Sequence, residues 1–167
     1  MPLIVDGEFV RDLWEPDDLD GSEGELFGND GSWVRLRHLE EPAMCGLEVA
    51  ADIEFATLLG LSSEQVLIAI RFVSQGDGRG LSLASSLRTY GYGGRLRAVG
   101  PLIADQYAYL LGVGFDEVEI PQAMASRQSP LHWRRAQAEH SVVYQQSRAG
   151  IESALGRRHP HIFGGHA

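Results

Sequence analysis

The sequence has 167 residues, of which 44% are hydrophobic and 22% are charged, as expected for one soluble domain of ordinary size. All 14 basic side chains are arginines, which excludes lysine chemistry such as a Schiff base or the lysine of a phosphate-binding P-loop. The net charge of −9 argues against nucleic-acid binding. The single cysteine, Cys45, excludes an internal disulfide, a dithiol redox pair and a cysteine-held iron–sulfur cluster.

The first 60 residues are strongly acidic, with 15 acidic side chains and three arginines. Within them, residues 17–31 carry Asp, Glu, Gly, Ser and Asn and few apolar side chains, which indicates a solvated, mobile loop. Its charge serves solubility or offers a docking surface for a basic partner. Residues 1–5 have no basic region before them, and the longest apolar run, 66–70, is too short to span a membrane. We therefore expect a cytoplasmic protein that does not contact membranes.

The middle of the chain alternates predicted strands and helices. Residues 33–37 and 46–51 are candidate strands, and 52–59 is a candidate helix. The apolar, β-branched run 66–72 predicts a strand that is buried on both faces. A helix is predicted over 81–90, where Gly91 ends it, and a second helix over 101–111, with Pro101 in its first turn. Further strands are predicted over 96–99 and 116–120. Ser129 and Pro130 begin a long C-terminal helix that runs to about residue 148.

This alternation with short connections predicts right-handed βαβ units. The expected fold is α/β, with a small parallel sheet in a half-barrel or flavodoxin-like arrangement and a long C-terminal helix. Residues 1–167 are treated as a single domain, in which the His- and Gly-rich residues 156–167 form a flexible tail.

The sharpest local feature is the segment GDGRG at residues 76–80, read as a loop between a strand and its helix. Ligands of parallel sheets lie outside the carboxyl ends of the strands, and exposed amides at a helix start favour anions. Gly78, Gly80 and the guanidinium of Arg79 therefore form a candidate site for phosphate, sulfate or carboxylate. Asp77 is a candidate base. The alternative is that Asp77 caps the helix and that Arg79 pairs with a nearby carboxylate.

The loop does not fit the dinucleotide-binding fingerprint, because Leu81 or Leu83 stands at the third glycine position. Arg95 and Arg97 stand where an acidic residue would end the following strand. Such arginines suit an NADP site, but the glycine pattern does not, so no cofactor is assigned. No metal site is expected either, since His159, His161 and His166 lie in the flexible tail.

The predicted helix over 101–111 carries Gln106 in the middle of its apolar stripe. A buried amide must be hydrogen-bonded, so Gln106 fastens a neighbouring loop or reaches into a site. Asp105 lies beside it and Tyr109 one turn later. The candidate catalytic residues are Asp77 and Asp105, and the candidate ligand-binding residues are Gly78, Arg79, Gly80, Ser82, Arg97, Gln106 and Tyr109.

Residues 77–116, DGRGLSLASSLRTYGYGGRLRAVGPLIADQYAYLLGVGFD, resemble the signature of an uncharacterised bacterial family of unknown function. A later segment, SVVYQ at 141–145, is similar to the same family. The residues that carry the resemblance are Asp77, Gly78, Arg79, Gly80, Ser82, Ala84, Leu87, Arg88, Tyr90, Gly91, Tyr92, Gly94, Leu96, Arg97, Ala98, Gly100, Asp105, Gln106, Tyr109, Gly114 and Phe115. Members of that family are commonly encoded beside assimilatory sulfite reductase and are described as oxidoreductases of sulfite reduction.

The chain departs from this pattern at two places. Arg95 stands where the family has an acidic residue, and residues 71–75, RFVSQ, replace a run similar to Asp-Phe-Pro-Lys-Phe. A redox activity also needs a cofactor-binding pattern, and the sequence shows none.

The resemblance implies a place in sulfur assimilation, with sulfite reductase or another protein of that pathway as partner. The leading expectation is a cytoplasmic accessory protein of assimilatory sulfate and sulfite reduction that binds a small anionic metabolite at the glycine loop. Two alternatives stay open: an enzyme that acts on a phosphorylated or sulfated metabolite, and a ligand-free scaffold for reductase subunits.

Overall fold

A mixed eight-stranded sheet forms the centre of the molecule. The computed structural model describes residues 1–17 and 33–147, with the backbone alone from 140 to 147. The strands are β1 (Leu3–Val5), β2 (Glu8–Val10), β3 (Trp14–Pro16), β4 (Trp33–His38), β5 (Cys45–Ala50), β6 (Leu67–Arg71), β7 (Arg95–Val99) and β8 (Glu117–Glu119). The helices are α2 (Phe55–Ser62), α3 (Gly78–Thr89), α4 (Ala104–Val113), α5 (Gln122–Ala125) and α6 (Pro130–Ser147). Residues 18–31 of the acidic segment and the tail 156–167 lie outside the described residues.

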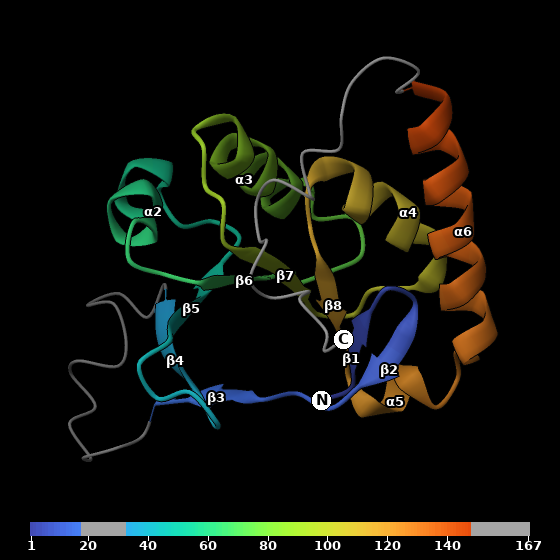
Figure 1. Cartoon of the computed structure of the whole chain (residues 1–167), viewed down its shortest axis with the longest axis horizontal. Coiled ribbons are helices and arrows are strands. Elements are labelled where there is room, and N and C mark those ends of the chain that lie inside the picture. The colour runs from blue at the N-terminus through green and yellow to red at the C-terminus, as the bar shows by residue number, and fades with distance from the viewer. Residues whose placement is uncertain (18–32, 148–167) are drawn as a thin grey trace, which may run out of the picture.

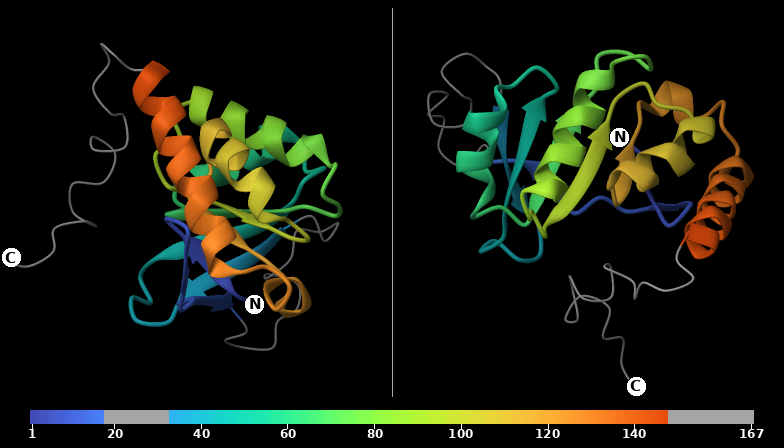
Figure 2. Two further views of the ribbon diagram at one scale, coloured as in Figure 1. Left: turned by 90° about the vertical axis from the view of Figure 1, so that its right-hand side faces the viewer. Right: turned by 90° about the horizontal axis from the view of Figure 1, so that it is seen from above.

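The sheet has the strand order β2-β1-β8-β7-β6-β5-β4-β3. Its four central strands, β5 to β8, pair in parallel and follow one another in chain order. Figure 1 shows the connecting helices α2, α3 and α4 on the same side of the curled sheet, and Figure 2 shows the same layering from two further directions. Sequential strand order with all crossover helices on one face is the half-barrel arrangement, whereas a flavodoxin-like sheet carries helices on both faces.

The prediction of a purely parallel sheet is wrong. β1 and β2 form an antiparallel hairpin that adds to β8, and β3 and β4 add antiparallel strands beside β5. The hairpin turns at Asp6 and Gly7, both with positive φ (50° and 78°), the conformation that Asp-Gly turns favour. The connection from β4 to β5 is too short for a crossover helix, so these two strands pair antiparallel.

Both faces of the central strands are covered. The helix-side face buries a large apolar cluster that includes Ile68, Ile70, Leu96 and Ala98. Alternate residues point the other way, and there Leu36, Leu67, Ala69 and Val99 form a smaller cluster against Trp14. The second face also carries charged residues, described below.

Three helix starts differ from the sequence-based expectation. α2 begins at Phe55 and not at residue 52. α3 begins at Gly78, so residues 78–80 form its first turn and not a loop before it. Gly80 fits there because a Cβ at this position would lie 2.6 Å from the ring of Phe72. α4 begins at Ala104, after Pro101, because the Gln106 side chain accepts a hydrogen bond from the Ile103 amide and caps the helix there.

Candidate functional site

The Asp77–Arg79 pair lies at the carboxyl end of β6, where α3 begins. Oδ1 of Asp77 accepts a hydrogen bond from the backbone amide of Arg79 at 3.1 Å and caps the helix. The Arg79 guanidinium folds onto the same carboxylate, with Nε 3.0 Å from Oδ1 and Nη2 2.9 Å from Oδ2. These hydrogen bonds, first from the side chain and then from the amide, lower the pKa of Asp77. A carboxylate held in this way is a poor general base at neutral pH.

Two further polar side-chain groups at the start of α3 have partners within the chain. Nη1 of Arg79 lies 3.5 Å from Oδ2 of Asp52, which follows β5. The hydroxyl of Ser82 donates to the carbonyl of Gly78 at 3.2 Å, and Gly80 is buried against Phe72. The amide and guanidinium of Arg79 and the hydroxyl of Ser82 therefore bind the chain's own carboxylates and carbonyl in this structure.

Gln106 links α4 to the same loop. Its Nε2 donates to the carbonyl of Gln75 at 2.8 Å, while its Oε1 accepts from the amide of Ile103 at 3.2 Å. Both ends of the amide are thereby used to hold the β6–α3 connection against the start of α4. Asp105 and Tyr109 are exposed on α4, so neither side chain is gathered into a closed site.

Arg97 lies on the opposite face of the sheet from α3. Its neighbours Leu96 and Ala98 face the helices, so Arg97 points from β7 into the curled face. Its guanidinium binds three carboxylates: Glu117 through Nε at 2.6 Å, Glu119 through Nη1 at 2.9 Å, and Asp12 through Nη1 and Nη2 at 2.7 and 2.9 Å. Arg97 therefore does not join the glycine loop in one site.

The cluster of Arg97, Asp12, Glu117 and Glu119, the curled-face ion cluster, has a buried centre and a partly exposed rim. The side chain of Arg97 is 3% exposed and that of Glu117 is 1% exposed. Burial lowers the pKa of Arg97, but Glu117 and Asp12 outweigh it, so that the pKa stands above its usual value. Burial raises the pKa of Glu119, and Arg97 offsets this only in part. Arg95 also pairs with Glu117 from the cluster's rim.

Arg88 forms hydrogen bonds to several of the residues that carry the family resemblance. From the last turn of α3 it donates to the carbonyls of Tyr92, Gly94 and Gly114 at 2.9, 2.7 and 2.9 Å, and to Asp116 at 2.6 Å. Oδ2 of Asp116 also accepts from the amide of Leu96 at 2.8 Å. These residues thus lock the end of α3 to β7 and β8.

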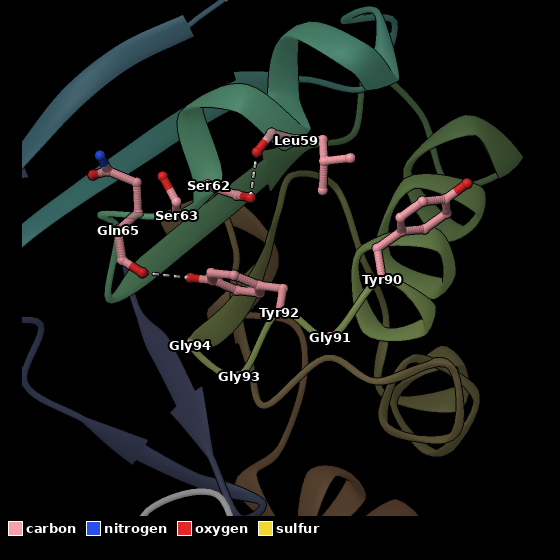
Figure 3. Close-up of a pocket in the computed structure, with 9 residues that line it drawn as sticks. All are labelled: Leu59, Ser62, Ser63, Gln65, Tyr90, Gly91, Tyr92, Gly93 and Gly94. Carbon is pink, nitrogen blue, oxygen red and sulfur yellow. Dashed lines mark hydrogen bonds between the residues drawn. The ribbon is translucent and has the colours of Figure 1, made fainter.

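A pocket of about 340 Å³, outside the predicted site, lies at the other edge of the sheet, where β6 and β7 begin. Figure 3 shows the end of α2 on one side of it and the connection from α3 to β7 on the other. It is lined by Leu59, Ser62, Ser63, Gln65, Tyr90, Gly91, Tyr92, Gly93 and Gly94. The Gly- and Tyr-rich run at 90–94 is the signal that points to this place, because such residues open space beside aromatic rings.

Within residues 1–17 and 33–147, no group of His, Cys, Asp and Glu side chains is arranged to hold a metal ion. In the same part of the chain, no helix combines the length and the apolarity needed to cross a bilayer. Residues 46–154 match the model of a family described as a bacterial protein of unknown function (DUF934). No curated protein and no solved structure matches the chain significantly.

Proposed function

The chain belongs to the DUF934 family of bacterial proteins of unknown function, and from this premise we propose that it is a cytoplasmic accessory protein of assimilatory sulfate and sulfite reduction. In this proposal it docks onto sulfite reductase or another protein of sulfur assimilation and has no catalysis of its own. The resemblance of residues 77–116 supports the pathway. The strongly acidic residues 1–60 favour a partner with a basic surface.

One observation supports docking over catalysis: the polar side chains nominated for chemistry hold the fold together. The carboxylate of Asp77 and the guanidinium of Arg79 are hydrogen-bonded to each other. Both ends of the Gln106 amide are hydrogen-bonded to backbone groups. Arg97 is enclosed by three carboxylates on the other face. A catalytic site instead keeps a base or a nucleophile within reach of a substrate.

Light scattering of the purified full-length chain mixed with purified assimilatory sulfite reductase tests this function. A defined complex that weakens as salt is raised is the expected result, because an acidic surface would contribute to the contact. The variant Arg79→Ala should form the same complex. Absence of a complex at low salt, or sulfite turnover by the chain alone, would overturn the proposal.

Anion binding at the start of α3 is a second candidate. The Asp77 carboxylate occupies the place where a bound anion would sit, on the amide and guanidinium of Arg79, and the Arg79 side chain is 56% exposed. A sulfate or phosphate ion could therefore replace that carboxylate.

The test of anion binding is the melting temperature in sulfate and in chloride at equal ionic strength. Sulfate should stabilise the wild type, and more strongly Asp77→Asn, in which the competing charge is gone. Arg79→Ala should lose the effect. Equal stabilisation of the wild type and Arg79→Ala would rule the anion site out. Turnover of a phosphorylated or sulfated metabolite would show that the same site is an active site.

A further inference from the structure

Residues 11–13, which we call the strap, connect the two edges of the sheet. β2 lies at one edge and β3 at the other, so the chain between them has to cross the curled sheet. Figure 1 shows this connection as the blue segment between β2 and β3, on the side of the sheet away from α2, α3 and α4. The strap therefore covers the curled face, into which Arg97 points.

One side chain attaches the middle of the strap to that face. The Asp12 carboxylate binds both terminal nitrogens of Arg97, with Oδ2 2.7 Å from Nη1 and Oδ1 2.9 Å from Nη2. Oδ1 also accepts a hydrogen bond from the amide of Trp14 at 3.1 Å. Among the described residues, the backbone groups of Arg11 and Asp12 make no hydrogen bond. The Asp12 carboxylate is thus what holds this part of the strap against the curled face.

The family match separates Asp12 from the groups that it binds. Residues 46–154 match the family model, so Arg97, Glu117 and Glu119 lie inside the match and Asp12 lies outside it. The matched part of the chain therefore contains an arginine with two of its three carboxylates. The third carboxylate reaches the arginine from a segment outside the match.

The position of Asp12 is also the one that solvent reaches. The side chain of Asp12 is 20% exposed, whereas those of Arg97 and Glu117 are buried. Glu117 binds Nε of Arg97, so Nη1 and Nη2 form the fork that faces the strap. A guanidinium fork matches the two oxygens of a carboxylate, and Asp12 uses it in this way. Asp12 is in this sense an internal ligand of Arg97.

The charges of the cluster decide which anion can replace Asp12. Two arginines, Arg95 and Arg97, face three carboxylates, those of Asp12, Glu117 and Glu119. A carboxylate in place of Asp12 leaves this balance unchanged. Sulfate, with two negative charges, adds repulsion toward the two glutamates that stay. Since β2 and β3 hold the two ends of the strap, its displacement admits a small molecule and not a protein surface.

We propose that Arg97 binds the carboxylate of a small molecule and that the strap closes this site, with the Asp12 carboxylate in the place of the ligand. The carboxylate of the ligand binds Nη1 and Nη2 of Arg97, and Asp12 moves into solvent with the strap. This inference does not depend on the function proposed above, because neither docking nor the start of α3 is involved in it.

The variant Asp12→Ala tests whether the site accepts an added carboxylate. Sodium acetate, compared with sodium chloride at equal ionic strength, should raise the melting temperature of full-length Asp12→Ala more than that of the wild type. The concentration dependence of this difference gives the Kd of acetate. Acetamide and sulfate should change the melting temperatures of both proteins equally.

Glu8→Ala is the matched control. Glu8 also binds a guanidinium, that of Arg134, but both side chains of this pair are about half exposed. An ion pair in such contact with water contributes little, so acetate should not distinguish Glu8→Ala from the wild type. Acetate that acts equally on Asp12→Ala, Glu8→Ala and the wild type would overturn the proposal.

Hydrogen exchange of the wild type tests whether a ligand displaces the strap, and it needs no variant that folds. The Trp14 amide reports on opening, because it donates to Asp12 in the closed strap. A ligand that binds only the open form multiplies the open population by 1 + [acetate]/Kd. Exchange of the Trp14 amide should accelerate by this factor in acetate and stay unchanged in acetamide. Exchange that does not respond to concentrated acetate would show that the Asp12–Arg97 pair is structural only.

Discussion

Replacement of Arg97 by methionine tests the role of the curled-face ion cluster. The substitution keeps much of the side-chain volume but removes a guanidinium that makes four hydrogen bonds to three carboxylates. Removal of one partner of a buried ion pair typically costs about 3–5 kcal/mol, because the other charge stays buried without compensation. For a chain of this length, that loss corresponds to a fall in melting temperature of roughly 6–20 °C.

The pH dependence of this loss has a definite sign. Burial already raises the pKa of Glu119, and Arg97 offsets this in part, so removal of Arg97 raises that pKa further in the folded variant. The folded variant then binds more protons than its unfolded state, and its stability falls as pH rises through the raised pKa of Glu119. The difference between wild type and variant should therefore be largest at neutral pH and shrink toward pH ~5.

Urea unfolding followed by tryptophan fluorescence measures both effects. Asp12→Asn is the control: the side chain of Asp12 is 20% exposed and Arg97 keeps Glu117 and Glu119, so a loss of about 1–2 kcal/mol is expected. A loss below about 1 kcal/mol for Arg97→Met, or a loss that does not change with pH, would refute the reasoning.

Three further predictions concern other parts of the fold. Burial raises the pKa of Glu119, so its stabilising contribution is present below the unfolded pKa and is lost as pH rises. The free energy of unfolding of Glu119→Gln, relative to that of the wild type, should therefore increase as pH rises, which unfolding at several pH values measures. Gly94→Ala places a Cβ 2.2 Å from the Tyr92 hydroxyl and should lower the melting temperature, whereas Gly93→Ala meets no atom within 4 Å and should not; equal melting would contradict this packing. Gln106→Leu should speed hydrogen exchange in residues 74–81, and unchanged exchange would count against its clamping role.

The parallel core could be predicted because its signals are local. The apolar run of β6 and the glycines at positions 91 and 114 mark where strands and helices begin and end, and both glycines have positive φ. Ser129 and Pro130 likewise mark the start of α6, where the Ser129 hydroxyl accepts from the amide of Leu131 at 3.2 Å.

The strands β1, β2 and β3 were missed because each has three residues, too few to show a period. Residues 33–37 were predicted as a strand, but their antiparallel pairing was not. The Asp6-Gly7 turn between β1 and β2 was the available signal. The helix starts were misplaced because side chains from a few residues away fixed them, Gln106 for α4 and Phe72 through Gly80 for α3.

The structure shows the arrangement that the sequence analysis gave as the alternative, with Asp77 capping α3, Arg79 paired with it and Gln106 holding the loop, but Arg97 does not join them. The sequence alone does not show on which face of the sheet the Arg97 side chain lies, because a shift of the strand register by one residue moves every side chain to the opposite face. Nor can it show that Asp12, 85 residues before Arg97, supplies the carboxylate that binds it. Long-range ion pairs of this kind depend on the tertiary fold.

The most direct test of the proposed function is the binding of the purified chain to purified assimilatory sulfite reductase, measured by calorimetry for the wild type and for the double variant Asp77→Asn, Arg79→Ala. A docking protein whose Asp77–Arg79 pair only shapes the start of α3 predicts saturable binding by the wild type and the same affinity for the variant. No binding by the wild type, with sulfite turnover by the isolated chain that the variant loses, would contradict it.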